Sequence, residues 1–209
     1  MSETKEHDMA GDSLIADLVA KVTSVIEDYA EELTELDRAI GDGDHGLNMQ
    51  RGFRAVGEIS GELETLGFGA ALNKVGMTLV MKVGGASGPL YGSAFMAMGK
   101  HAEAAPASWE EVSALLGAGI EAVKKRGKSD AGAKTMLDVL IPVHAAINAG
   151  ADIGAVREAA AAALEATRPM RATKGRAAFL GERSEGHLDP GARSSERIIV
   201  AVCDVLEES

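Results

Sequence analysis

Acidic residues crowd one glycine-rich stretch of the sequence, AIGDGDHGLNMQRGF at residues 39–53. A single glycine separates Asp42 from Asp44, and Asp37 lies a few residues upstream. Carboxylates within ~4 Å of one another repel by about 1 kcal/mol per pair even in water, and by more in a partly buried site. A hard divalent cation would offset this repulsion, and magnesium is the usual choice beside phosphates. The stretch therefore predicts a magnesium site; a solvated acidic turn is the alternative that these residues leave open.

Two other ligand-binding motifs fit this stretch poorly. Gly41, Gly43 and Gly46 match G-x-G-x-x-G, but a dinucleotide-binding loop follows a strand, whereas helical spacing precedes this one. A calcium-binding EF-hand loop would have Gly46 at its fifth position and Phe53, not glutamate, at its twelfth. Both motifs are rejected.

A second stretch, VGGASGPLYG at residues 83–92, has the chemistry of a phosphate-binding turn. Its glycines allow the backbone to approach a ligand closely, and Ser87 can donate a hydrogen bond. A helix that begins at Pro89 would offer unpaired N–H groups to a phosphate. Close helix packing through small residues is the alternative explanation.

A third stretch, residues 168–195, is basic and shows no sustained periodicity. Lys174, Arg176 and Arg183 can neutralise phosphate charge, and Asp189 to Gly191 is predicted to form a tight turn. Long irregular segments in compact domains are usually functional or disordered, and both readings stay open here. Taken together, the three stretches predict a phosphoryl-transfer site.

The remaining reactive side chains give weaker signals. His45 directly follows the acids and would either face a nucleotide or help to close the turn. His101 and His144 are expected on helix surfaces or in the core, and Cys203 is expected to be a core residue.

Helices are predicted to carry all three stretches. Apolar residues recur at helical spacing from Leu14 to Leu36, which predicts a long amphipathic helix that delivers Asp37 at its end. Ser108 and Glu111 have capping-box spacing, and Gly127 is suited to end the same helix. Similar patterns predict further helices over residues 49–56, 68–83, 89–101, 108–127, 133–149, 152–168 and 195–207. With no convincing strand, we expect an all-α, single-domain fold of eight helices over residues 13–209, after a flexible tail at residues 1–12.

Composition supports this fold class and excludes some functions. Of 209 residues, 46% are hydrophobic but only seven are aromatic, so aliphatic side chains and nine methionines must fill the core. The net charge of −11 argues against nucleic-acid binding. Because the lone cysteine cannot form an internal disulfide and no apolar run reaches membrane-spanning length, we expect a soluble, cytoplasmic protein with no membrane partner.

Four stretches resemble, in the same order, the motifs of one known family. LDRAIGDGDHGLNMQRGF, GGASGPLYGSAF, GKSDAGAKTMLDVL and KGRAAFLGERSEGHLDPG are similar to motifs of the nucleotide-binding L subunit of dihydroxyacetone kinase. The resemblance extends from about residue 13 to residue 207. It implies an antiparallel eight-helix barrel with the nucleotide site at one end, and it implies two Mg²⁺ ions and ADP or ATP as cofactors.

The resemblance also implies roles for individual residues. Asp37, Asp42 and Asp44 would bind the metal ions and, with Arg176, form the catalytic group. The residues expected to bind the nucleotide are His45, Gly46, Leu47, Asn48, Gly85, Ala86, Ser87, Gly127, Thr135, Met136, Arg176, Asp189, Pro190 and Gly191. Among these, Ala86 and Ser87 would hold phosphate, Gly127, Thr135 and Met136 would border the adenine or ribose, and Arg176 and the turn at residues 189–191 would cover the nucleotide.

The implied activity needs partners. The resemblance implies a kinase subunit that acts with a separate K subunit, which holds dihydroxyacetone covalently on a histidine. In one version of the family, ADP stays bound and a phosphorylated M subunit of the phosphotransferase system recharges it; in others ATP exchanges. Both versions stay open, as do a related ketose substrate such as erythrulose, a nucleotide-responsive regulatory module and a homodimer.

Overall fold

Apolar residues at helical spacing fold into helices along almost the whole chain. The computed structural model describes the backbone of residues 3–208 and the side chains of residues 14–208. Its elements are α1 (Glu3–Asp28), α2 (Ala30–Ile40), α3 (His45–Gly57), α4 (Ser60–Leu63), α5 (Phe68–Lys82), α6 (Ser87–His101), α7 (Trp109–Gly127), α8 (Leu137–Asn148), α9 (Ile153–Ala166), the 3₁₀ helix η1 (Arg176–Ser184) and α10 (Pro190–Glu208). Residues 3–208 contain no strand, which confirms the all-α prediction.

Eight of the α-helices in this range form the predicted antiparallel barrel, and two further ones, α2 and α4, lie outside its ring. The predicted first helix is interrupted at Tyr29, whose φ of −95° and ψ of 2° divide α1 from α2. The break is small, because the amide of Leu33 still donates to the carbonyl oxygen of Tyr29 at 2.9 Å. The short helix α4 was not predicted. α1 already begins at Glu3, so it runs through most of the segment expected as a tail.

Several helix ends differ from the sequence-based expectation. α3 begins at His45 and not at residue 49, α6 at Ser87 and not at Pro89, and α8 at Leu137 and not at residue 133. α10 begins at Pro190, five residues earlier than predicted, because Asp189 caps it: Asp189 Oδ2 accepts from the amide of Ala192 at 2.7 Å. Asp189 to Gly191 is thus a helix start and not an isolated turn. At the end of α7 the left-handed residue is Lys128, with φ of 48°, and not Gly127. The capping residue Ser108 is confirmed, since its side chain accepts from the amide of Glu111.

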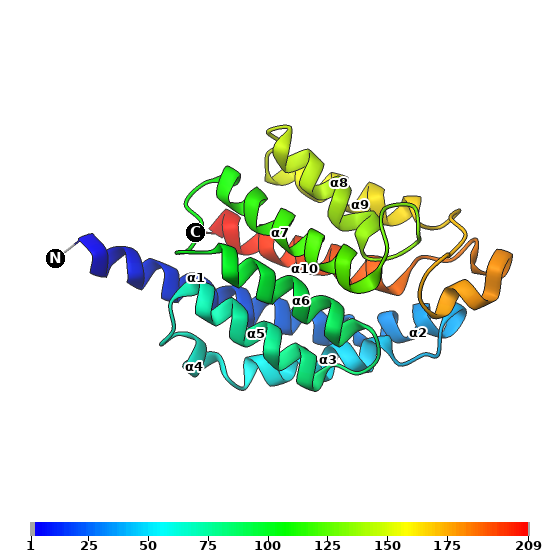
Figure 1. Cartoon of the computed structure of the whole chain (residues 1–209), viewed down its shortest axis with the longest axis horizontal. Coiled ribbons are helices and arrows are strands. Elements are labelled where there is room, and N and C mark those ends of the chain that lie inside the picture. Colours follow the sequence, from blue (N-terminus) through cyan, green and yellow to red (C-terminus); the bar gives the residue numbers. More distant parts are fainter. Residues whose placement is uncertain (1–2, 209) are drawn as a thin grey trace.

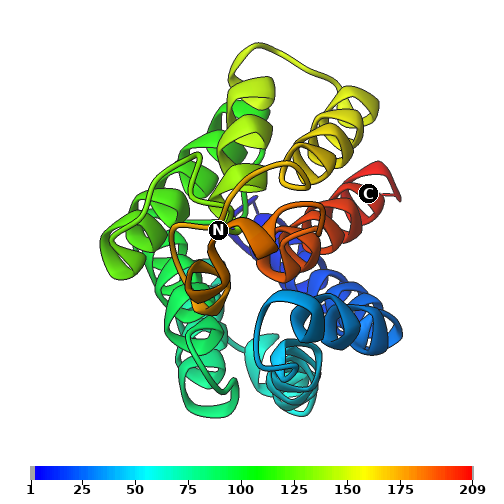
Figure 2. The same ribbon diagram turned by 90° about the vertical axis from the view of Figure 1, so that its right-hand side faces the viewer.

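The long helices run up and down and close into a ring (Figures 1 and 2). Each packs on its neighbour in the order α1, α3, α5, α6, α7, α8, α9 and α10, and α10 returns to pack on α1. Fully buried side chains such as Ile26, Met49 and Leu79 fill the interior. Apolar side chains of the ring also line a pocket of about 210 Å³. No helix within the described residues is both long enough and apolar enough to cross a bilayer.

The alternating directions bring four helix N-termini, those of α3, α6, α8 and α10, to one end of the ring (Figure 1). Unpaired N–H groups and the helix dipole make each N-terminus attractive to anions. This end of the ring is therefore suited to bind a multiply charged ligand.

Glycines bring the backbones of α5 and α6 into contact. A methyl group on Gly76 would lie 2.7 Å from the carbonyl oxygen of Gly92, and one on Gly99 would lie 2.5 Å from that of Gly69. Helix interiors disfavour glycine, so this close approach explains why both helices contain it. The contact fixes the position of the glycine-rich turn that joins them.

Candidate active site

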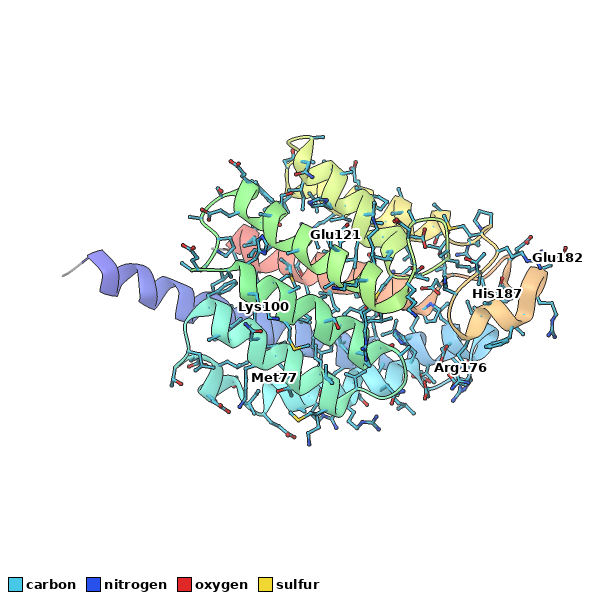
Figure 3. The ribbon with its side chains drawn as sticks, in the orientation of Figure 1. Met77, Lys100, Glu121, Arg176, Glu182 and His187 are labelled. Carbon is cyan, nitrogen blue, oxygen red and sulfur yellow. The ribbon has the colours of Figure 1, made fainter. Side chains whose placement is uncertain are left out.

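The predicted site residues gather at the end of the ring where the four N-termini meet. A groove of about 150 Å³ opens there, and nine of the predicted residues line it: Asp37, His45, Ser87, Thr135, Met136, Arg176, Asp189, Pro190 and Gly191. Lys174, which the sequence analysis named as able to neutralise phosphate charge, also lines the groove. The lining residues that were missed include Tyr91, Lys134 and the apolar Ile40, Leu90 and Ala177. Figure 3 shows Arg176 and His187 at this end, away from Lys100 and Met77.

The three predicted metal ligands converge. One carboxylate oxygen from each of Asp37, Asp42 and Asp44 lies within 4.8 Å of the other two. Asp37 is buried at the end of α2, whereas Asp42 and Asp44 are exposed. Oxygen-only donors with open faces fit Mg²⁺, which usually keeps waters or phosphate oxygens among its ligands.

Asp37 has a second role that the sequence did not reveal. Its Oδ2 accepts from the backbone N–H groups of Asp44, at 2.9 Å, and His45, at 3.1 Å, so it caps the first turn of α3. The turn between them depends on glycine: Gly43 has φ of +75°, and a methyl group on Gly41 would lie 2.0 Å from Asp37 Oδ1. The acidic turn, residues 37–46, is therefore shaped by local backbone contacts.

His45 joins two stretches of the site. Its Nδ1 lies 3.0 Å from Ser87 Oγ at the start of α6, and its Nε2 lies 2.9 Å from Ser194 Oγ in α10. Burial lowers the pKa of His45, which opposes the influence of Asp37 and Asp44 and favours the neutral ring. A neutral imidazole has one donor and one acceptor, and both hydroxyl contacts use them. The side chain thus links the start of α3 to α6 and α10, and it also lines the groove. Both predicted roles of His45, facing a nucleotide and closing the turn, stay predictions.

A buried tyrosine extends this network. Tyr91 Oη lies 2.8 Å from both Ser194 Oγ and Ser195 Oγ, and burial raises the pKa of Tyr91 to about 12. These residues were missed because about 100 residues separate Tyr91 from its partners, and no local spacing records such a contact. The network ties the start of α6 to the start of α10 across the groove.

Arg176 reaches the acidic turn from the opposite side. Its guanidinium Nη2 lies 3.0 Å from Asp42 Oδ2, with 71% of the arginine side chain exposed. The residue belongs to the covering segment, residues 168–189, which connects α9 to α10 and contains η1. At the far end of this segment, burial raises the pKa of Asp189 to about 7. Hydrogen bonds from backbone amides only partly offset that effect.

The other predicted residues lie near the groove but outside its lining. They are Asp42 and Asp44 in the acidic turn, Gly46, Leu47 and Asn48 in the first turn of α3, Gly85 and Ala86 before α6, and Gly127 at the end of α7. Leu47 is 59% exposed and points to solvent. Asn48 is buried, and its Oδ1 accepts from Arg51 at 2.7 Å.

Comparison with known proteins identifies the family. The DAK2 domain model matches residues 39–204. The chain is 46% identical, over 85% of its length and 88% of the relative, to the ADP-binding subunit DhaL of PEP-dependent dihydroxyacetone kinase 1 from Listeria innocua. It is 44% identical, over 90% of its length and 94% of the relative, to the ADP-binding subunit DhaL of the PTS-dependent dihydroxyacetone kinase of Lactococcus lactis.

A solved structure shows the same fold. The dihydroxyacetone kinase from C. freundii in complex with AMP-PNP and Mg²⁺ superposes with a TM-score of 0.73 at 26% identity. The match covers 92% of this chain but only 34% of that larger chain. The predicted resemblance to kinase L subunits is confirmed, and the chain belongs to the DAK2-domain family.

Proposed function

We propose that this chain is the Mg²⁺- and ADP/ATP-binding subunit of a dihydroxyacetone kinase. In this role it transfers the ATP phosphoryl group to dihydroxyacetone held on a separate K subunit. One observation carries the proposal: three carboxylates, four helix N-termini and Arg176 lie in or beside a single groove. Polyphosphate bound with divalent cations has the charge pattern that such a groove recognises.

Each part of the groove has a role in this proposal. Asp37, Asp42 and Asp44 hold two Mg²⁺ ions, which when bound neutralise charge on the phosphate oxygens. Ser87 and the N–H groups that begin α6 bind phosphate, and Thr135 and Met136 border the nucleoside. Arg176 covers the phosphates and stabilises charge that develops during transfer.

The substrate side is assigned to a partner. The groove of this chain is lined by residues suited to the nucleotide, and the relatives from Listeria innocua and Lactococcus lactis are ADP-binding subunits of dihydroxyacetone kinases. We assign the ketose and any general base to the K subunit. PEP- and PTS-dependent relatives favour recharging of bound ADP by a phosphorylated M subunit in the cytoplasm, where Cys203 would stay reduced.

Calorimetry and reconstitution test the proposal. ADP should bind in the presence of magnesium and should not bind in EDTA. Equal ADP affinity with and without magnesium would contradict the proposed site. Adding a K-type subunit and dihydroxyacetone should give dihydroxyacetone phosphate. If nucleotide binds but no transfer occurs with dihydroxyacetone or erythrulose, the chain is a regulatory module instead.

A second reconstitution separates the phosphoryl donors. A phosphorylated M subunit should support many turnovers from retained ADP, whereas excess free ATP should support few. The reverse result would assign an ATP-exchanging mechanism. The mass of the purified subunit in solution decides whether it is a homodimer, which the sequence analysis left open.

A further inference from the structure

Lys134 is a long cationic side chain that is almost completely buried. Only 1% of its surface is exposed, and it lies in the loop before α8 with φ of 60°. Lys128, the other lysine with positive φ among the described residues, is exposed. A left-handed backbone and a buried ammonium are each unfavourable for lysine, so the contacts of Lys134 must compensate for both.

Backbone carbonyl groups supply those contacts. The Nζ of Lys134 donates to the carbonyl oxygens of Met170 at 3.0 Å, Ser184 at 2.5 Å and His187 at 2.7 Å, and lies 3.4 Å from that of Arg168. An ammonium has three donors, and the three shorter contacts use all of them. All four carbonyl groups belong to the covering segment, at both ends of η1.

The loop that carries Lys134 is itself held firmly. The two carboxylate oxygens of Asp138, in the first turn of α8, accept from the amides of Gly132 and Thr135. One further tether joins this loop to the covering segment, because the amide of Thr173 donates to the carbonyl oxygen of Ala133 at 3.2 Å. The neighbours Thr135 and Met136 line the groove directly.

We infer that Lys134 is a positioning residue that fixes the base of the covering segment to the nucleoside side of the groove and so holds Arg176 above the acidic turn. The buried ammonium group of Lys134 binds backbone carbonyl groups from both ends of the covering segment and so holds these ends together. Removing its charge releases the segment while the acidic turn keeps its own backbone contacts. The effect on nucleotide affinity rests on the proposed function, whereas the effect on the segment does not.

Hydrogen exchange of the free, full-length chain tests the structural part. In Lys134→Met, amides of residues 168–188 should exchange at least about tenfold faster than in the unchanged protein. The same amides should be unaffected in Lys100→Met, a control at an exposed lysine far from the groove (Figure 3). Lys134→Gln, which keeps N–H donors without the charge, should be intermediate. The inference would be overturned if amide exchange of residues 168–188 were unchanged in Lys134→Met. It would also be overturned if exchange in Lys134→Met became faster by the same factor in every helix.

Ligand binding tests the functional part. The affinity of Lys134→Met for Mg-ADP should fall about tenfold. This follows if the covering segment is in place in only about one molecule in ten, because the apparent affinity is reduced by that fraction. Binding of Mn²⁺ alone, which probes the acidic turn, should stay the same or rise, because release of the segment takes Arg176 away from Asp42. Equal losses for Mn²⁺ and Mg-ADP would show general damage and contradict a positioning role. If the unchanged protein does not bind Mg-ADP, the proposed function is wrong. The hydrogen-exchange result then still decides whether Lys134 holds the covering segment in place.

Discussion

The acidic turn and the covering segment lie on opposite sides of one groove but are held in different ways. Asp37 accepts hydrogen bonds from amides seven and eight residues ahead, so contacts along a short piece of chain shape the acidic turn. The covering segment depends on Lys134, whose carbonyl partners lie 34 to 53 residues away. The groove thus has a preformed side, the acidic turn, which local contacts shape, and a covering side, which contacts between distant parts of the chain hold in place.

The largest effect is expected from Asp42→Asn on the preformed side. Loss of one carboxylate should weaken magnesium-dependent ADP binding by more than about 100-fold, measured by calorimetry. The melting temperature of the free protein should not fall, because one repulsive charge is removed. Asp28→Asn, at an exposed aspartate in α1, is the control. Equal ADP affinity in both variants would show that the acids do not bind metal.

Gly46→Ala should disrupt the packing of α3 on α2 beside the acidic turn, because the added methyl group has no room there. A methyl group there would lie 1.9 Å from the carbonyl oxygen of Ala30, so α3 must move away from α2. We expect a loss of about 2–3 kcal/mol in the free energy of unfolding, measured with urea. Gly61→Ala, where no atom lies within 4 Å of the added methyl group, should be neutral or slightly stabilising. Similar losses in both variants would contradict this packing argument.

Arg176→Gln tests the covering side without disturbing the acidic turn. We expect Mg-ADP affinity to fall about tenfold, equivalent to ~1.4 kcal/mol. Affinity for Mn²⁺ alone should stay the same or rise, because the arginine no longer pairs with Asp42. Since exposed ion pairs stabilise little, the melting temperature should not change. Arg54→Gln, which removes an exposed pair with Glu27, should leave both affinities unaltered; a matching loss of Mg-ADP affinity there would make the Arg176 effect nonspecific.

The smallest effect concerns pH and Asp189, at the end of the covering segment. Burial raises its folded-state pKa to about 7, a shift that Asp138 reinforces and Lys134 opposes. The contribution of Asp189 to the free energy of unfolding is complete below the pKa that its carboxyl group has in the unfolded chain. It is lost as the pH rises through the pKa of Asp189 in the folded protein. Between pH 6 and 7 the unchanged protein should therefore lose about 1 kcal/mol more stability than Asp189→Asn, measured with urea. Parallel losses would contradict the raised pKa, because His45 and the other groups titrate in both proteins.

Local sequence patterns predicted the helices and much of the groove. Periodicity located the helices, and the acidic and glycine-rich stretches marked the turns that follow α2 and α5, beside the groove. The cap at Ser108 followed from two residues three positions apart. These features depend on neighbours in the chain, which is why they could be predicted.

Other features depend on partners that the local pattern does not contain. The break at Tyr29 preserves helical spacing and most hydrogen bonding, so periodicity did not reveal it. Nothing near Lys134 indicates that its ammonium binds carbonyl groups beyond residue 167. Asp189 before Pro190 did carry a readable helix-start signal, but the same residues also suit a turn.

The glycine contact between α5 and α6 limits how the groove can admit its ligand. Side chains that interdigitate can change rotamer and let helices slide, but two touching main chains have no such freedom. Ser87 begins α6, whose backbone is fixed against α5, so Ser87 cannot move aside to let a nucleotide leave. Exchange must proceed by displacement of the opposite wall, so spin labels on η1 and α6 should separate on release of nucleotide while labels on α5 and α6 keep their spacing.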